Sequence, residues 1–195
     1  MAATGKSWLA AAAAPVRTQP KGGHLLHRTY QFSYVHRSMD RKNEDYKNQI
    51  KNIATVGTVE EFWAVYTHLN RVNKLSPNTD YFLFQKGVQP MWEDDANKRG
   101  GRLTIRLQKA ASPRAFEDLC LALIGEQFET DDICGIACSV RTYENNLSIW
   151  LKDANNKQLL GRVEAIARRV LNLEAKIVLR DWSFKPHNTD QPANV

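Results

Sequence analysis

The segment Met91–Asp95 places an aromatic ring beside carboxylates, a pairing that can recognise a purine base. The indole of Trp92 offers a stacking surface, and the carboxylate of Glu93 can accept hydrogen bonds from N1 and N2 of guanine. A base methylated at N7 is positively charged, so stacking on it gains a cation–π contribution on the order of 0.5–2 kcal/mol. The competing interpretation is a core tryptophan beside a solvated acidic turn, and these residues alone do not separate the two.

The acidic run Glu93, Asp94 and Asp95 also has the chemistry to hold a divalent metal for phosphate hydrolysis. No histidine or cysteine lies close by in the sequence to complete a transition-metal set, and no nucleophile is paired with a base. The chain's cysteines and histidines likewise lack the spacing of metal ligands. We therefore expect no metal, no cofactor and no enzymatic activity.

Alternating segments predict strands with one buried and one open face, which is typical of an antiparallel sheet. The clearest lie at 30–34, 102–107 and 146–151, and a further strand is expected at 134–141 if Cys134 and its alternate neighbours face the core. Arginine suits phosphate through its fixed fork of donors, and aromatic rings suit bases. A solvated face with scattered arginines remains the alternative. The open positions are Arg102, Thr104, Arg106, Gly135, Ala137, Ser139, Arg141, Ser148 and Trp150.

Three helix starts are legible between the strands. Thr58 and Glu61 form a capping box, and Ser112 before a proline opens a helix that is expected to stop at Gly125. Asp153 is expected to cap a third helix, whose apolar face lies within 163–171. Together with half-exposed strands, these helices predict an α+β fold: a curved antiparallel sheet with three helices on one face and a ligand on the other.

Composition limits the function only broadly. The 195 residues carry 27 Lys and Arg against 21 Asp and Glu, a net charge of +6 that favours an anionic partner such as nucleic acid. Three cysteines suggest no disulfide framework and favour a reducing compartment such as the cytoplasm. No run approaches the roughly 20 apolar residues of a membrane helix. We expect a basic, alanine-rich disordered tail at 1–23 (a signal or transit peptide being the alternative), one domain at 24–184 and a flexible tail at 185–195.

The segment Met91–Arg102 resembles the tryptophan–glutamate cap loop of the translation initiation factor 4E family. Val59–Tyr66, Leu123–Glu126 and Ile133–Gly135 match the family in order and spacing, and the similarity spans residues 24–182. The resemblance implies that the helices cover the convex face of the sheet. It also implies that a slot on the concave face binds the 7-methylguanosine 5′ cap of messenger RNA.

The resemblance assigns a role to each residue of the slot. Trp92 is one slice of an aromatic sandwich, and the second slice falls 17 residues before Trp63, at Tyr46. Glu93 reads guanine, Trp150 contacts the N7 methyl group, and two arginines bind the cap phosphates. The implied cap-binding residues are Tyr46, Trp92, Glu93, Arg102, Arg141 and Trp150.

Tyr46 is the informative departure, because initiating members of the family carry tryptophan there and the 4E-homologous class carries tyrosine. Tyr30 and Ser33 likewise replace tryptophans of the initiating class, and Asn146 replaces a lysine that contacts phosphate. These differences imply weaker cap binding and favour a translational repressor. The alternatives are an initiating factor that delivers capped messages to the scaffold protein, an enzyme acting on the cap, and a generic single-strand binder. Lys185 is a further candidate phosphate contact.

The resemblance implies a second site, where the helix-covered back binds a tyrosine- and leucine-containing helical motif of 4E-binding proteins. Trp63 lies on an apolar stripe, so periodicity alone places it in the core, whereas the family pattern turns Val59 and Trp63 outward and Phe62 and Tyr66 inward. The usual His-Pro-Leu entry motif is His24-Leu-Leu here. We expect a monomer with no membrane contact. The implied partner-binding residues are His24, Val59, Trp63, Asp118, Leu121 and Glu126.

Overall fold

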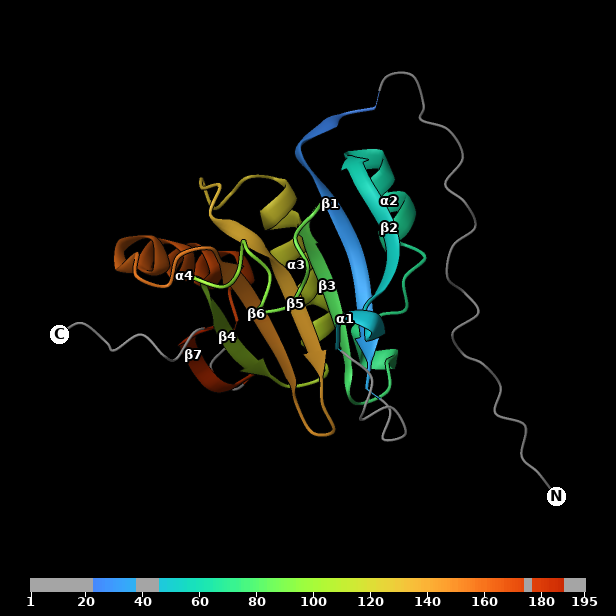
Figure 1. Ribbon diagram of the computed structural model, residues 1–195. Helices are drawn as coiled ribbons and strands as arrows, with labels where there is room; N and C mark the ends of the chain where they lie inside the picture. Colours follow the sequence, from blue (N-terminus) through green and yellow to red (C-terminus); the bar gives the residue numbers. More distant parts are fainter. Residues whose placement is uncertain (1–22, 38–45, 174–176, 188–195) are drawn as a thin grey trace.

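A seven-stranded antiparallel sheet forms the centre of the computed structural model, which describes residues 23–37, 46–173 and 177–187 (Figure 1). The strand order is β2-β1-β3-β5-β6-β4-β7, and every neighbouring pair is antiparallel. The half-exposed, alternating segments thus form the sheet that their periodicity predicts. The strands are β1 (Leu25–His36), β2 (Lys51–Thr58), β3 (Thr79–Gln85), β4 (Gly101–Leu107), β5 (Ile133–Val140), β6 (Asn145–Leu151) and β7 (Val178–Pro186).

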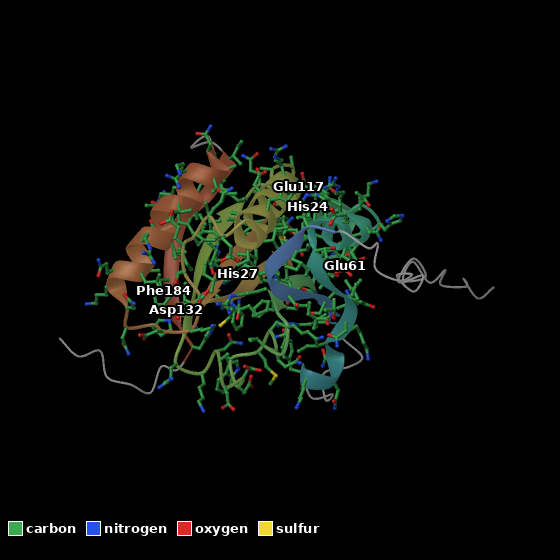
Figure 2. All side chains as sticks on the ribbon, turned by 90° about the horizontal axis from the view of Figure 1, so that it is seen from above. His24, His27, Glu61, Glu117, Asp132 and Phe184 are labelled. Carbon is green, nitrogen blue, oxygen red and sulfur yellow. The ribbon has the colours of Figure 1, made fainter. Side chains whose placement is uncertain are left out.

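Three longer helices cover one face of the sheet, and the predicted α+β architecture is confirmed. Figure 2, seen from above, shows them along one side of the sheet, with the loop between β3 and β4 on the other. The structure adds a four-residue helix, so the expected count of three holds only for the longer ones. None of the described helices is long and apolar enough to cross a membrane. The helices are α1 (Tyr46–Gln49), α2 (Val59–Tyr66), α3 (Ser112–Ile124) and α4 (Lys157–Leu171), with a 3-10 turn, η2 (Val72–Lys74).

The start of α2 follows the capping-box prediction. The Thr58 hydroxyl accepts a hydrogen bond from the Glu61 N–H at 3.1 Å, which satisfies one of the free donors of the first turn. The Glu61 carboxylate accepts from the N–H of Gly57 at 2.7 Å, one residue before the cap. Two main-chain donors are therefore satisfied where β2 turns into α2.

The caps of the other two helices differ from the prediction. Ser112 is the first residue of α3 rather than its cap, and its hydroxyl donates back to the Gln108 carbonyl at 3.1 Å. Asp153 caps a turn before α4, while Asn156 caps the helix by accepting from a main-chain N–H three residues on, at 3.0 Å. Both errors arise because Ser, Asp and Asn bind nearby main-chain groups equally well in turns and at helix starts. The predicted stop of α3 at Gly125 is confirmed.

The core lies between the helices and the facing side of the sheet, where alternate strand residues are fully buried. All three cysteines are buried free thiols, and burial raises the pKa of Cys120 and Cys138, so both stay protonated. The largest fully buried side chains are Tyr30, Phe32, Phe62, Phe84, Phe116, Phe128, Leu83, Leu103, Ile105, Leu107, Leu119 and Ile133.

A bulge in β5 changes the predicted alternation at one position. Ile133 pairs with Leu151 and Gly135 pairs with Trp150, so Cys134 is an extra residue in its strand. Its side chain packs beside Trp150 on the open face, and its thiol lies 3.6 Å from the Ala96 carbonyl oxygen. The condition that Cys134 faces the core is therefore wrong. From Gly135 to Ser139 the register is as predicted.

Candidate functional site

The open face of the sheet carries an apolar floor rather than a fully solvated surface. Partly buried side chains border it: Tyr46 and Ile50 from the α1 region, and Val88 and Ala96 from the β3–β4 loop. Apolar surface with polar groups at its margin is typical of a small-ligand site. The apolar floor consists of Val35, Phe82, Phe84, Cys134, Ala137 and Trp150.

The β3–β4 loop holds Trp92 and Glu93 outward by turning its other polar side chains inward. The two carboxylate oxygens of Asp94 accept main-chain N–H groups of the loop at 3.0 and 2.9 Å. Asn97 is fully buried, and its amide donates to two loop carbonyls at 2.7 and 2.8 Å. Trp92 keeps 57% of its surface exposed. These internal hydrogen bonds fix the conformation of the loop, and its exposed side chains offer an aromatic ring and a carboxylate.

Glycines at the end of this loop allow it to enter β4. A Cβ on Gly100 would lie 2.9 Å from the carbonyl carbon of Leu151, and one on Gly101 would lie 2.8 Å from the Lys185 carbonyl oxygen. Neither backbone neighbour can yield, because both belong to strands that pair beside the loop. The double glycine therefore serves close backbone packing at the point where Arg102 leaves the loop.

The three carboxylates of the acidic run have different surroundings in the described structure. Asp94 faces inward onto main-chain donors, and Asp95 pairs with Lys98 at 2.7 Å. Among the described residues, the one group of His, Cys, Asp or Glu with metal-like proximity lies elsewhere, around Asp131. Asp94 and Asp95 are thus engaged within the loop, and Glu93 is the exposed acid beside Trp92.

Tyr46 lies on α1 at the border of the apolar floor. The guanidinium of Arg37 lies 5.4 Å from the centre of its ring, within the range of a cation–π contact. Burial, together with the negative charge of Asp80, raises the pKa of the Tyr46 phenol. Tyr46 is therefore a neutral aromatic ring that already accepts a cation on its surface.

Asp80 is a neighbour of the candidate site that sequence reasoning missed. Its carboxylate is buried between Arg141, at 2.8 Å, and Arg37, at 3.2 Å. A buried carboxylate requires such partners, and here it fixes the direction of both guanidinium groups. The two arginines together exceed its charge by one. The available signal in the sequence was a single acid directly before the apolar run Tyr81–Phe84.

Arg102 provides a second cation on the open face. It is exposed on β4, opposite Trp150 of β6 and Lys185 of β7. Residues paired across strands share a face, so all three side chains belong to the open side. No acidic group pairs with Arg102 within residues 23–37, 46–173 and 177–187. Its guanidinium is available to an anion.

Trp150 forms part of the floor and is covered more than the sequence suggests. Only 7% of its surface is exposed, because Phe84 packs edge-on at 5.4 Å and the ring of His187 lies 4.3 Å from its centre. Burial and the charge of Arg102 lower the pKa of His187 to about 4, so this ring is neutral near pH 7. No sequence signal pointed to His187. β7 runs to Pro186, two residues beyond the expected end of the domain.

The helix side carries a separate exposed aromatic surface. Val59 and Trp63 of α2 are exposed, Trp63 to 38%, whereas Phe62 and Tyr66 are buried. Trp63 rests edge-on against these two rings, at 5.3 and 6.0 Å. The outward orientation implied by the resemblance is confirmed, and the core placement expected from periodicity alone is wrong. In α2 the side that carries Phe62 and Tyr66 packs against the core, so the rest of the helix's apolar stripe, with Val59 and Trp63, remains exposed.

The remaining residues expected at this surface lie around α2 and α3. The carbonyl of His24 accepts the Val59 N–H at 2.9 Å, and its ring pairs with Glu60 at 2.8 Å. On α3, Asp118 pairs with Arg114 at 2.8 Å, and Leu121 is half-buried. Glu126 follows α3 in a left-handed conformation, with φ of 56°, and accepts from the Tyr30 hydroxyl at 3.4 Å. The structure thus places these groups apart from the apolar floor, on the other side of the sheet.

Comparison with known proteins gives a consistent picture. Residues 25–194 match the family model described as eukaryotic initiation factor 4E. The rice eukaryotic translation initiation factor NCBP (Oryza sativa subsp. japonica) is 38% identical over 168 residues, which cover 86% of this chain and 73% of that protein. The Caenorhabditis elegans eukaryotic translation initiation factor 4E-4 is 36% identical over 167 residues, with 85% and 77% covered.

Solved structures show the same fold. Ascaris suum eIF4E-3 in complex with the m2,2,7G cap has a TM-score of 0.78 and 28% identity, covering 87% of this chain and 94% of that one. C. elegans eIF4E-3 with the 4E-binding protein Mextli and a cap analogue has a TM-score of 0.77 and 28% identity, with 85% and 93% covered. The family match, the relatives and the fold agree: this chain belongs to the eukaryotic initiation factor 4E family.

Proposed function

We propose that this protein binds the 7-methylguanosine 5′ cap of messenger RNA on the open face of its sheet. The observation that carries the proposal is the exposed Trp92–Glu93 pair, held outward by a cross-braced loop beside the apolar floor. A similar chain, Ascaris suum eIF4E-3, has been solved with the m7G cap. The site needs no cofactor and transforms no substrate, since its groups offer stacking, hydrogen bonding and charge.

The recognition chemistry divides between the two ends of the cap. Trp92 and Tyr46 sandwich the positively charged base, while Glu93 accepts hydrogen bonds from its N1 and N2 and offsets its charge. Trp150 lies in the floor, where the methyl group is expected. Among the described residues no acid pairs with Arg102, which can therefore reach the phosphate chain, and Asp80 holds Arg141 so that it meets the chain in a fixed direction.

We further propose that the surface around Trp63 binds 4E-binding proteins through a helical motif with tyrosine and leucine. Exposed Val59 and Trp63 give an apolar centre, and Glu60, Asp118 and Glu126 give a polar margin. The similar C. elegans eIF4E-3 has been solved with the 4E-binding protein Mextli. Because the proposed cap site lies on the opposite side of the sheet, a monomer can hold both ligands at once.

The role we favour is cytoplasmic repression of translation by competition for capped messages. Tyr46 offers less stacking area than tryptophan, and Asn146 supplies no cation for phosphate, so the cap is bound more weakly than by a protein with tryptophan and lysine there. The alternative role is delivery of capped messages to an initiation scaffold. The two roles are separated by measuring the affinity of the protein for a 4E-binding peptide from a repressor and for one from a scaffold protein. Tighter binding of the scaffold peptide would reverse our assignment.

The cap proposal is tested by titration with 7-methyl-GTP and GTP, followed by tryptophan fluorescence. Trp92→Ala is expected to abolish the response to 7-methyl-GTP, because it removes one wall of the sandwich. Trp63→Ala is the matched control: it removes an exposed indole from the other face and should leave nucleotide affinity unchanged while weakening peptide binding. Equal responses of the wild type to both nucleotides would refute cap recognition.

A further inference from the structure

The turn between β5 and β6 presents an aromatic ring that is not packed into the described part of the fold. Tyr143 keeps 90% of its surface exposed, the largest fraction among the large apolar side chains that the structure describes. The turn is closed by the Arg141 N–H, which donates to the Glu144 carbonyl at 3.1 Å. The closed turn fixes the backbone that carries the ring, so binding has to order only the side chain of Tyr143.

The surroundings of Tyr143 are cationic rather than apolar. Arg141 lies two residues before it, and the Lys109 ammonium donates to the Thr142 carbonyl at 3.3 Å. The acid of the turn, Glu144, is paired with Arg106 at 3.0 Å. The centre of a protein–protein contact needs clustered apolar side chains, which this turn lacks. A ring among cations is instead the arrangement that binds single-stranded nucleic acid.

The turn also continues the open face on which the cap site lies. Gly135, Ala137 and Ser139 of β5 lie opposite Trp150, Ser148 and Asn146 of β6, and β4 brings Arg102, Thr104 and Arg106 to the same rows. From Trp150 to Asn146 the strand advances by roughly 14 Å, at about 3.4 Å per residue. A phosphate chain that leaves a base near Trp150 and follows Arg102 and Arg141 is directed towards Tyr143.

We propose that Tyr143 stacks on a nucleobase of the RNA that follows the cap, so that the protein binds the first transcribed nucleotides as well as the cap. The inference rests on the proposed cap-binding function and extends the same site. Lys109 supplies charge along this extension, together with the net positive charge of Arg37 and Arg141 over Asp80. Stacking tolerates any base, so the contact adds affinity for capped RNA without selecting a sequence.

The test compares 7-methyl-GTP with a capped oligoribonucleotide of about five nucleotides, a length that reaches past one stacked base. Tyr143→Ala is expected to weaken binding of the capped RNA about 5- to 20-fold, the lower part of the range for base stacking, and to change 7-methyl-GTP affinity by less than about twofold. Tyr143→Trp should restore RNA binding. Thr142→Ala, in the same turn, controls for a disturbed hairpin and should match the wild type.

The outcomes separate this inference from the cap proposal. If the wild type binds 7-methyl-GTP selectively but Tyr143→Ala binds capped RNA as tightly as the wild type does, the contact is refuted and cap binding stands. An equal loss for both ligands would also overturn the contact, since it would show damage to the cap site. If the wild type fails to prefer 7-methyl-GTP over GTP, the cap proposal fails and the extension falls with it.

Discussion

Replacing Gly135 by alanine should damage the floor of the site severely. A Cβ at Gly135 would lie 2.6 Å from the main-chain oxygen of Leu83 and would overlap the ring of Phe84. Both neighbours are buried, and Phe84 packs edge-on against Trp150 at 5.4 Å, so the ring has little room to retreat. Overpacking costs about 1–3 kcal/mol, and a clash with backbone and ring together belongs at the upper end, about 3 kcal/mol.

Gly161→Ala is the matched control, because a Cβ there meets nothing within 4 Å on the exposed side of α4. The same methyl group should stabilise that helix by about 0.5–1 kcal/mol. Urea unfolding of the two variants should therefore shift in opposite directions, and for Gly135→Ala a melting temperature lower by about 6–12 °C is expected. In the fraction of Gly135→Ala that stays folded, 7-methyl-GTP should quench tryptophan fluorescence less than it does in the wild type. Equal midpoints for both variants would refute the packing argument.

Two further predictions concern the walls of the site. Tyr46→Trp should raise 7-methyl-GTP affinity by on the order of fivefold with little change for GTP, because a larger ring gains stacking and cation–π energy; fluorescence titration that shows no gain would contradict the sandwich. The pKa of His187 is lowered to about 4 in the folded protein, from 6.5 in the unfolded chain. As the pH falls from 6.5 towards 4, the unfolded chain therefore takes up the proton before the folded protein does, and the free energy of unfolding decreases over that range. The loss should reach about 1–2 kcal/mol, because the ring is only partly buried, and His187→Phe should remove that part of the pH dependence in urea unfolding. Identical pH profiles of the variant and the wild type would show that His187 does not cover Trp150.

Local pattern was enough for much of the fold. A strand's two-residue period is a property of neighbouring residues, so the shared face of Arg102 and Trp150 follows from their alternation, and the register confirms it. The capping box at Thr58 is equally local and formed as predicted. The motif of the β3–β4 loop predicts a cap loop, although its inward-facing Asp94 could not be distinguished from Glu93 by residue type alone.

Tertiary structure decided what depends on contacts between distant segments. Cys134 faces the open side because β6 pairs with β5 through a bulge, and no single strand records its partner's register. Asp80 orients Arg141 across 61 positions of sequence, and His187 covers Trp150 only because β7 adds to the far edge of the sheet. The sequence alone determined which residue types the open face carries, through short-range periodicity. Their exposure, pairing and charge environment required the fold, because burial and electrostatics depend on every segment that packs nearby.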